Sequence, residues 1–518
     1  MTYRERALYS KIGYGVGICI CVLFLYSLGA PSTRDSSGQV LPGGHLAQLR
    51  AQYGLTEANL GEISAAGETI KLATLGLRGV AVNLLWERAH EYKMKKDWTS
   101  LSATLQQLAK LQPRFISVWQ FQAWNVSYNC SVEFDDYRDR YRWVIKGIQY
   151  LREGISYNQY EPRLLWDQGW FTGHKIGRAD EKTQFRRLFR QDNDFHDSLP
   201  LELRDPTRDN WLCGKRCFQG VVQLHEAGHK MKGKSPLLFY SDAPKSQINY
   251  ADAIVEEGIF DEVALEAWRR AAVEWRQYGK VNIETTFRDP RTGEILFIRL
   301  NDKDEDENYL AQAQKHIAAL EALAPGLREK LRQQKLATLT KRERDALETP
   351  PAQRTAQEYE LAMAAERKIA VSHEELAQRI EGPQRAKALQ LAREAKLAEQ
   401  MAEYIDRYRQ IVNFEYWRLR CQVEQDPQTL QARKYIYEAD QEALINLPKA
   451  LENYQKGLAA WRKVLDTHPK LLDDRTTGEE LVEVIDRYRE HLGRIGEPRL
   501  PPDFPLQDVL DRYGKKGS

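Results

Sequence analysis

The chain has 518 residues, which is too long for one ordinary hydrophobic core and predicts several domains or a stacked array of helical repeats. Hydrophobic residues make up 42% and charged residues 29%, a composition that excludes a wholly disordered chain, and a single short apolar stretch excludes a membrane protein with many spans. The 76 basic and 74 acidic residues leave a formal net charge of +2, so the sequence lacks the electrostatic signature of nucleic-acid binding and we expect no nucleic-acid partner.

The first element that the sequence predicts is a membrane anchor over residues 12–30. This stretch contains no charged residue and approaches the roughly 20 apolar residues that a helix needs to cross a bilayer. Its length, with bulky Leu28 near its end, favours an uncleaved transmembrane anchor, and a cleaved secretory signal is the alternative. Because basic residues precede it in residues 1–11, we expect a cytoplasmic N-terminus and place the bulk of the chain outside the cytoplasm, on the periplasmic side.

After a polar linker over residues 31–44, the sequence follows the helical period through residues 45–279. Apolar helices recur here in pairs, and each pair is about as long as one tetratricopeptide unit. A C-terminal region over residues 400–497 shows the same organisation. Such units bury their apolar faces only by stacking, so we predict a curved solenoid whose inner surface binds other proteins. An irregular helical domain with aromatic packing is the alternative.

Two segments match the tetratricopeptide pattern most specifically. In each, small residues let the second helix of a pair approach the first, and a large aromatic side chain fills the space between the helices. Another predicted helix precedes each match, so we expect a helix pair at both places. These positions are Ala264, Trp268 and Ala271 in the first segment, and Ala450, Tyr454 and Gly457 in the second.

Two segments interrupt the helical pattern. Residues 280–301 alternate apolar and polar side chains on either side of a turn at Asp289–Gly293, which predicts a small β-hairpin insertion. Residues 302–399 are rich in Ala, Glu, Leu, Lys, Arg and Gln and are broken by prolines, which predicts a charged arm of long, solvated helices. The proline-rich residues 498–518 predict an extended tail.

Several blocks of the sequence carry a resemblance to a known family. They are LRGVAVNLLWERAHEYKMKKDW at 77–98, SPLLFYSDAPKSQINYADAIVEEG at 235–258, NFEYWRLRCQVEQD at 413–426, YEAD at 437–440 and GLAAWRKVLDTHP at 457–469. Together the blocks resemble a family of uncharacterised planctomycete single-pass membrane proteins with tetratricopeptide-like repeats, some of them labelled iron-responsive-element proteins. The resemblance implies one N-terminal anchor followed by tetratricopeptide-like helices. We do not extend RNA binding to this chain, because its sequence has neither a basic patch nor a recognisable RNA module.

One motif of the sequence carries catalytic chemistry. His225, Glu226 and His229 form an HExxH pattern, whose two histidines would share one face of a helix and could bind zinc, with the glutamate taking a proton from bound water. A zinc peptidase needs a third ligand, and the nearest candidates, Glu256–Glu257, fall in a helix assigned to a repeat. The preferred interpretation therefore has no metal and no catalytic residue, with His225 packed on an apolar face and the helix ending at Gly228.

A second metal hypothesis joins Cys213 and Cys217 to His225 and His229 as four ligands of a structural zinc ion. The spacing between the two pairs is shorter than a zinc finger normally has, and ligands on one or two adjacent helices do not readily converge. A disulfide between the two cysteines is a further alternative. The preferred interpretation again has no cofactor.

These observations predict a mostly α protein, with an N-terminal transmembrane helix, a tetratricopeptide-like solenoid, a β-hairpin insertion and a charged helical arm. The expected function is that of a membrane-anchored, extracytoplasmic, non-catalytic scaffold that binds protein partners through its helical repeats. The alternative function is a membrane-tethered zinc metallopeptidase that uses His225, Glu226 and His229.

Overall fold

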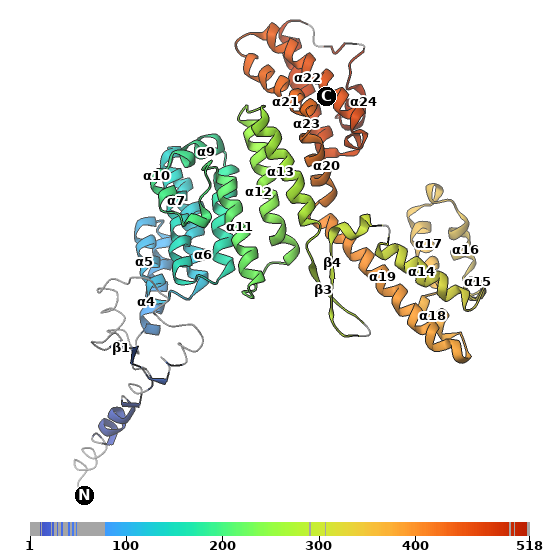
Figure 1. The fold of residues 1–518 in the computed structure, drawn as a ribbon, viewed down its shortest axis with the longest axis horizontal. Helices are drawn as coiled ribbons and strands as arrows, with labels where there is room; N and C mark the ends of the chain where they lie inside the picture. Colours follow the sequence, from blue (N-terminus) through green and yellow to red (C-terminus); the bar gives the residue numbers. More distant parts are fainter. Residues whose placement is uncertain are drawn as a thin grey trace. The chain divides into compact units, whose positions relative to one another are not determined.

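The computed structural model shows a mostly helical chain with two short antiparallel strand pairs (Figure 1). It describes residues 78–514 except 290–291, 306, 497–498 and 502, and before residue 78 only residues 11, 13–21, 23–24, 28, 33–34, 40–41, 44–45 and 48. The chain divides into two compact units. The first comprises residues 1–203 and 223–230, and the second comprises residues 204–222 and 231–518.

The predicted transmembrane helix over residues 12–30 is wrong. Part of this stretch lies outside the described residues. Within the part of the chain that the structure describes, no helix is both long and apolar enough to span a membrane. A stretch without charged residues is therefore not enough by itself to predict a membrane span. The membrane localisation that depended on the anchor is corrected with it.

Most of the remaining N-terminal predictions fall outside the described residues. These are the cytoplasmic segment 1–11, most of the linker 31–44 and most of residues 45–77. Within the linker, the structure shows one short antiparallel pair, β1 (Thr33–Arg34) and β2 (Val40–Leu41).

The first unit is built from helices that follow one another along the chain. Its elements are α4 (Arg78–Met94), α5 (Trp98–Leu111), α6 (Ile116–Trp124), the π-helix η2 (Asn125–Cys130), η3 (Ser131–Glu133), α7 (Tyr137–Tyr157), α8 (Pro162–Trp170), the π-helix η4 (Phe171–Lys175), α9 (Lys182–Gln191), α10 (Asn193–Asp197) and η5 (Leu201–Leu203). Aspartates begin three of these helices, because the Asp97, Asp136 and Asp192 side chains accept backbone N–H groups of the first turn of α5, α7 and α10.

Aromatic residues of the first unit occupy two different environments. Trp119 is fully buried, stacks on Tyr157 of α7 and donates its Nε1–H to the Pro113 carbonyl at 3.0 Å. Trp124, at the end of the same helix α6, is 47% exposed and stacks on Tyr128. The first ring therefore holds α6 against α7, while the second lies at the surface.

Helix α11 (Asn210–Glu226) contains residues of both units. The second unit continues with α12 (Pro236–Glu256), α13 (Glu262–Tyr278), β3 (Ile283–Arg288), β4 (Ile295–Ile298), η6 (Leu300–Asp304), α14 (Tyr309–Ala322), α15 (Leu327–Ala337), α16 (Lys341–Glu348), η7 (Pro351–Gln353), α17 (Ala356–Ile369), α18 (His373–Gln378), η8 (Gly382–Gln384), α19 (Arg385–Ile411), α20 (Phe414–Glu424), α21 (Pro427–Glu442), α22 (Leu447–Thr467), η9 (Pro469–Asp473), α23 (Arg475–Arg494) and α24 (Gln507–Tyr513).

The two tetratricopeptide-like matches both lie in closely packed helix pairs, α12 with α13 and α21 with α22 (Figure 1). In α13, Ala264 and Ala271 are fully buried on either side of buried Trp268. In α22, a Cβ atom at Gly457 would lie only 2.5 Å from Ile436 Cδ1 of α21, so only a hydrogen atom fits there. The small residues therefore allow the close packing that the pattern predicts, while a curved stack of repeats remains a prediction.

A pair of antiparallel strands, β3 and β4, lies inside the range predicted for a β-hairpin. Ile283 of β3 faces Ile298 of β4, and both are buried in the same apolar cluster as Trp268. Thr285 Oγ1 donates to the Leu296 carbonyl at 2.7 Å. The hairpin is therefore fixed to the core of the second unit by its apolar face.

The charged segment of residues 302–399 folds into a small helical body, with α14 packed along α19 (Figure 1). Leu320, Leu331 and Leu376 belong to an apolar cluster that also contains buried alanines of α19. Helix α19 continues to Ile411, because the change in composition near residue 399 interrupts neither its helical period nor its hydrogen bonds. The prediction of solvated helices is therefore incomplete, because it did not include this apolar core.

The predicted extended tail over residues 498–518 is wrong in its described part. Residues Gln507–Tyr513 form α24. Phe504, Leu506 and Val509 are buried in the apolar cluster of α21, α22 and α23. Prolines therefore bend the chain here, but these apolar side chains fold its end back onto the core.

Candidate functional site

The HExxH motif lies across the C-terminal end of α11. The helix ends at Glu226, and Gly228 has a φ of +97°, the left-handed conformation that glycine adopts most readily. The Gly228 N–H donates to the His225 carbonyl at 3.0 Å, and the His229 N–H donates to the Leu224 carbonyl at 2.9 Å. This Schellman pattern places His229 beyond the helix, so the two histidines do not occupy successive turns of one helical face.

The other predicted metal ligands lie in different surroundings. The His229 ring stacks on Tyr160, with centroids 4.7 Å apart. Cys213 and Cys217 are buried in α11 and form no disulfide, and burial raises the pKa of the Cys213 thiol above its usual range. Throughout the described residues, no three His, Cys, Asp or Glu side chains lie close enough together to hold a metal ion. Both zinc hypotheses remain untested predictions.

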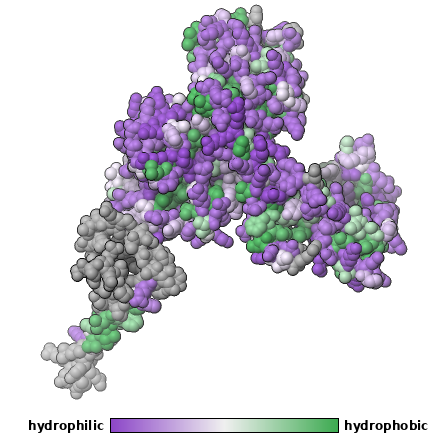
Figure 2. Space-filling view, in the orientation of Figure 1, coloured by the Kyte–Doolittle hydropathy of each residue, from purple (hydrophilic) through white to green (hydrophobic). Residues whose placement is uncertain are grey.

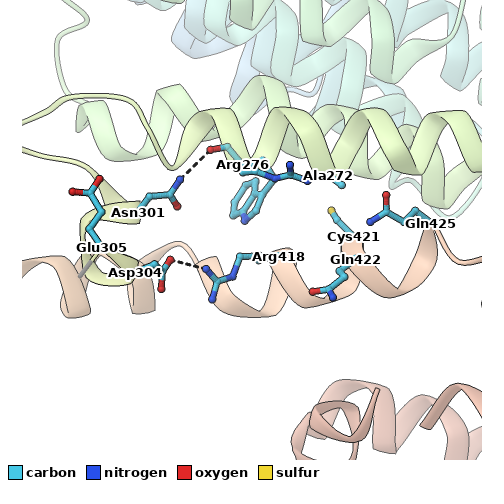
Figure 3. Close-up of a pocket in the computed structure, with 10 residues that line it drawn as sticks. Ala272, Arg276, Asn301, Asp304, Glu305, Arg418, Cys421, Gln422 and Gln425 are labelled. Atoms are coloured by element: carbon cyan, nitrogen blue, oxygen red, sulfur yellow. Dashed lines mark hydrogen bonds and ion pairs between the residues drawn. The ribbon is translucent and has the colours of Figure 1, made fainter. Parts of the chain in front are cut away.

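A cleft of about 540 Å³ lies in the second unit between α13, η6 and α20 (Figure 3). Its floor is apolar and its walls are polar. Ala272, Trp275, Arg276, Asn301, Asp304, Glu305, Arg418, Cys421, Gln422 and Gln425 line it.

Helical spacing explains how two distant segments supply the long walls. Positions 272, 275 and 276 of α13 are three and four residues apart, which brings their side chains to one face of the helix. Positions 418, 421 and 422 of α20 and position 425, its C-cap, extend the same spacing over two turns. The two helices are joined by Trp275, whose Nε1–H donates to the Phe414 carbonyl at 3.0 Å and whose ring stacks on the Phe414 ring.

The floor of the cleft offers no activated nucleophile. Trp275 and Cys421 are each 1% exposed. Burial raises the pKa of the Cys421 thiol to about 12, so the thiol stays protonated at neutral pH. The floor therefore presents an apolar surface.

Asn301 of η6 forms the short wall by capping the end of α13. Its backbone N–H donates to the Gly279 carbonyl at 2.9 Å, and its Nδ2 donates to the Arg276 carbonyl at 3.3 Å, as Figure 3 shows. These bonds satisfy carbonyl groups that the helix end leaves without helical partners. A Cβ atom at Gly279 would lie 2.4 Å from Asn301 Oδ1, so the close approach of η6 to α13 requires a glycine there.

Both acidic residues of the cleft form ion pairs with arginines. Asp304 Oδ2 lies 2.7 Å from Arg418 Nη1 (Figure 3), and Asp304 also pairs with buried Arg409. Burial lowers the pKa of the Arg409 guanidinium, and the Asp304 carboxylate opposes that shift. Glu305 pairs with Arg299 at 2.9 Å. Neither carboxylate is therefore available as an unpaired general base.

Three polar side chains of the cleft, Arg276, Gln422 and Gln425, form no hydrogen bond or ion pair with any described residue. A guanidinium group supplies donors only, whereas each glutamine amide both donates and accepts. The cleft therefore combines an apolar floor with unused hydrogen-bonding groups, which suits binding.

No protein-family model matches the chain, and comparison with curated proteins finds no match. The resemblance to planctomycete membrane proteins therefore remains a prediction, and the described helices contradict the anchor that it implies. The cleft was not among the features predicted from the sequence. The available signal was the group of polar residues Arg418, Gln422 and Gln425, within the block 413–426 that carries the resemblance.

Proposed function

We propose that this protein is a non-catalytic helical scaffold that binds a protein partner, and that a segment of the partner docks in the cleft between α13, η6 and α20. The observation that carries the proposal is the set of unused polar groups, Arg276, Gln422 and Gln425, above the buried floor of Trp275 and Cys421. The cleft suits binding of a partner, because the carboxylates of the cleft are ion-paired and the Cys421 thiol is protonated.

The dimensions of the wall suit an extended peptide. Along a helix, the seven steps from Arg418 to Gln425 rise about 10 Å, which is the length of about three residues of extended chain. Glutamine amides present the same donor and acceptor groups as a peptide bond, so Gln422 and Gln425 can pair with a partner backbone. The packing of α12 against α13 through small residues supports the side of the cleft that α13 supplies.

The surface around the helices is consistent with selective, local docking. On the face drawn in Figure 2, hydrophilic residues predominate and hydrophobic residues form separate patches. A polar cleft with a small apolar floor gives specificity through hydrogen bonds and shape. No observation favours the zinc peptidase, because the Schellman pattern separates His225 from His229.

Selection of binders from a display library of random 12-residue peptides on the full chain tests this proposal. We expect enriched peptides to bind the Gln422→Trp variant at least about tenfold more weakly, because the indole fills the cleft. Gln441→Trp is the matched control, since Gln441 is an exposed residue of α21 away from the cleft, and should bind the peptides like the native chain. Failure to enrich any peptide, or equal binding to both variants, would contradict the proposal.

A further inference from the structure

The cleft contains one charged side chain that has no partner among the described residues. Arg418 and Arg409 share the carboxylates of Asp304 and Glu415 in a network of two positive and two negative groups. The remaining acidic lining residue, Glu305, shares Arg299 with Asp302. Both carboxylates that line the cleft are thus already ion-paired.

Arg276 supplies the unmatched charge. It is an exposed residue in the last turn of α13, where the helix dipole favours a cation. The interaction with the helix dipole does not occupy the N–H donors of the guanidinium. No described residue accepts a hydrogen bond from them. The Asn301 amide donates to the Arg276 carbonyl and so fixes the backbone that carries this side chain.

A carboxylate is the group that this arrangement fits. A guanidinium binds a carboxylate through two parallel hydrogen bonds, which are stronger than hydrogen bonds between neutral groups. Nearby, Ala272, Trp275 and Cys421 give the apolar surface that an aliphatic side chain needs. Gln422 and Gln425 then remain for the backbone of the same segment.

We infer that the partner segment is acidic: an extended peptide with an Asp or Glu that pairs with Arg276 and a neighbouring aliphatic residue that contacts the floor. This inference rests on the proposed docking function and names the chemistry of its partner. The Arg276 guanidinium, which has no partner among the described residues and lies beside carboxylates that are already ion-paired, carries the inference.

The display selection, repeated on two charge-reversal variants of the full chain, tests the inference. With the native chain, we expect Asp and Glu to be enriched at one position beside Leu, Ile or Val. Arg276→Glu should abolish this enrichment and favour Lys or Arg at that position. Arg269→Glu is the matched control, because Arg269 is exposed on the same helix but lies outside the cleft, and its pool should stay acidic.

Titration of the best native peptide then gives the size of the effect. Replacing its Glu by Gln should weaken binding to the native chain about tenfold, and to Arg276→Gln by less than about twofold. Circular dichroism of each variant confirms that the helices are intact.

The outcomes separate the two proposals. Peptides that Gln422→Trp excludes but that show no acidic preference, or that bind Arg276→Gln as they bind the native chain, would overturn the acidic partner and leave the docking cleft standing. A native chain that enriches no peptide of any charge would overturn both.

Discussion

The aromatic core around α12, α13 and α20 and the charged body of α14 to α18 are both helical, yet different residues hold them together. Trp268, Trp275, Tyr278 and Phe414 fill the first, and each is 3% exposed or less. The second has leucines and alanines, such as Leu320 and Ala388 of its main cluster, and no buried aromatic side chain in either of its clusters. The first region buries large side chains that support the wall of the cleft.

The charged body depends more on local hydrogen bonds. Capping boxes begin α16 and α17, where Thr340 pairs with Glu343 and Thr355 pairs with Glu358. Glu343 also forms an ion pair with Lys368. The comparison shows that buried volume stabilises one region, while caps and charges contribute a larger share in the other. The two regions should therefore respond to different perturbations.

The largest effect is expected where the aromatic core loses volume. Trp268→Ala should lower the free energy of unfolding of the second unit by about 3 to 5 kcal/mol, because it empties the space between α12 and α13. Urea unfolding followed by circular dichroism measures the change. Trp124→Ala is the control at a 47% exposed tryptophan, with an expected change below about 1 kcal/mol. An equal loss of unfolding free energy in the two variants would contradict the prediction that the buried ring stabilises the protein more than the exposed ring.

A smaller effect is expected where η6 approaches the aromatic core. In Gly279→Ala the added Cβ would lie 2.7 Å from Phe414 Cζ as well as 2.4 Å from Asn301 Oδ1. We expect a loss of about 1 to 3 kcal/mol and weaker peptide binding, because Asn301 must move. The control is Gly493→Ala in α23, where no atom lies within 4 Å and alanine should stabilise the helix by up to about 1 kcal/mol. Unchanged stability of Gly279→Ala would contradict this prediction, because it would mean that Asn301 moves without a cost in free energy.

The charged body should respond to pH. A hydrogen bond from Lys368, followed by those from Thr340, lowers the pKa of Glu343 from 4.5 to about 2. Because the folded pKa lies below the unfolded one, this stabilisation is complete above about pH 4.5 and is lost as the pH falls toward 2. Amide exchange of α16 and α17, measured from pH 6 to pH 3 and corrected for intrinsic rates, should show the loss.

Two variants isolate that carboxylate. Glu343→Gln should remove most of the pH dependence of α16 and α17, whereas Glu360→Gln, at an exposed position of α17, should keep it. An identical pH profile in native protein and Glu343→Gln would mean that other groups cause the response.

We expect the HExxH motif to have no effect on the zinc content of the protein. Zinc per chain, measured by mass spectrometry on protein purified without chelators, should be the same in native protein and in a His225→Ala and His229→Ala double variant, because the glycine cap separates the two side chains. About one zinc per native chain, lost in the double variant, would establish the motif as a metal site.

Local patterns of the sequence predict the helix pairs and the strand pair well, because small residues, aromatic spacing and turn residues act over one or two turns of chain. Trp268 between Ala264 and Ala271 is the clearest case. The HExxH motif shows the limit of such patterns. The spacing of its histidines is correct for zinc, but Gly228 within the motif favours the end of a helix. The backbone hydrogen bonds of residues 228 and 229 form the Schellman pattern of such a helix end.

The cleft could not be predicted from the sequence, because its walls come from residues 272–276, 301–305 and 418–425, and only packing brings them together. Each segment alone shows a mixture of apolar and polar residues that fits any partly buried helix face. Long-range packing also determines the structure of the C-terminal tail. Phe504 and Leu506 pack into the core there, although prolines surround them in the sequence. The anchor prediction rested on the absence of charged residues, and no helix among the described residues is long and apolar enough to span a membrane.

The central claim is that partner segments dock in the cleft, and hydrogen–deuterium exchange of the full chain with a selected peptide tests it most directly. The account predicts slower exchange in residues 272–276, 301–305 and 418–425 when the peptide is bound, and no change in the Gln422→Trp variant. Unchanged exchange in all three segments, with protection only at another part of the chain, would contradict it.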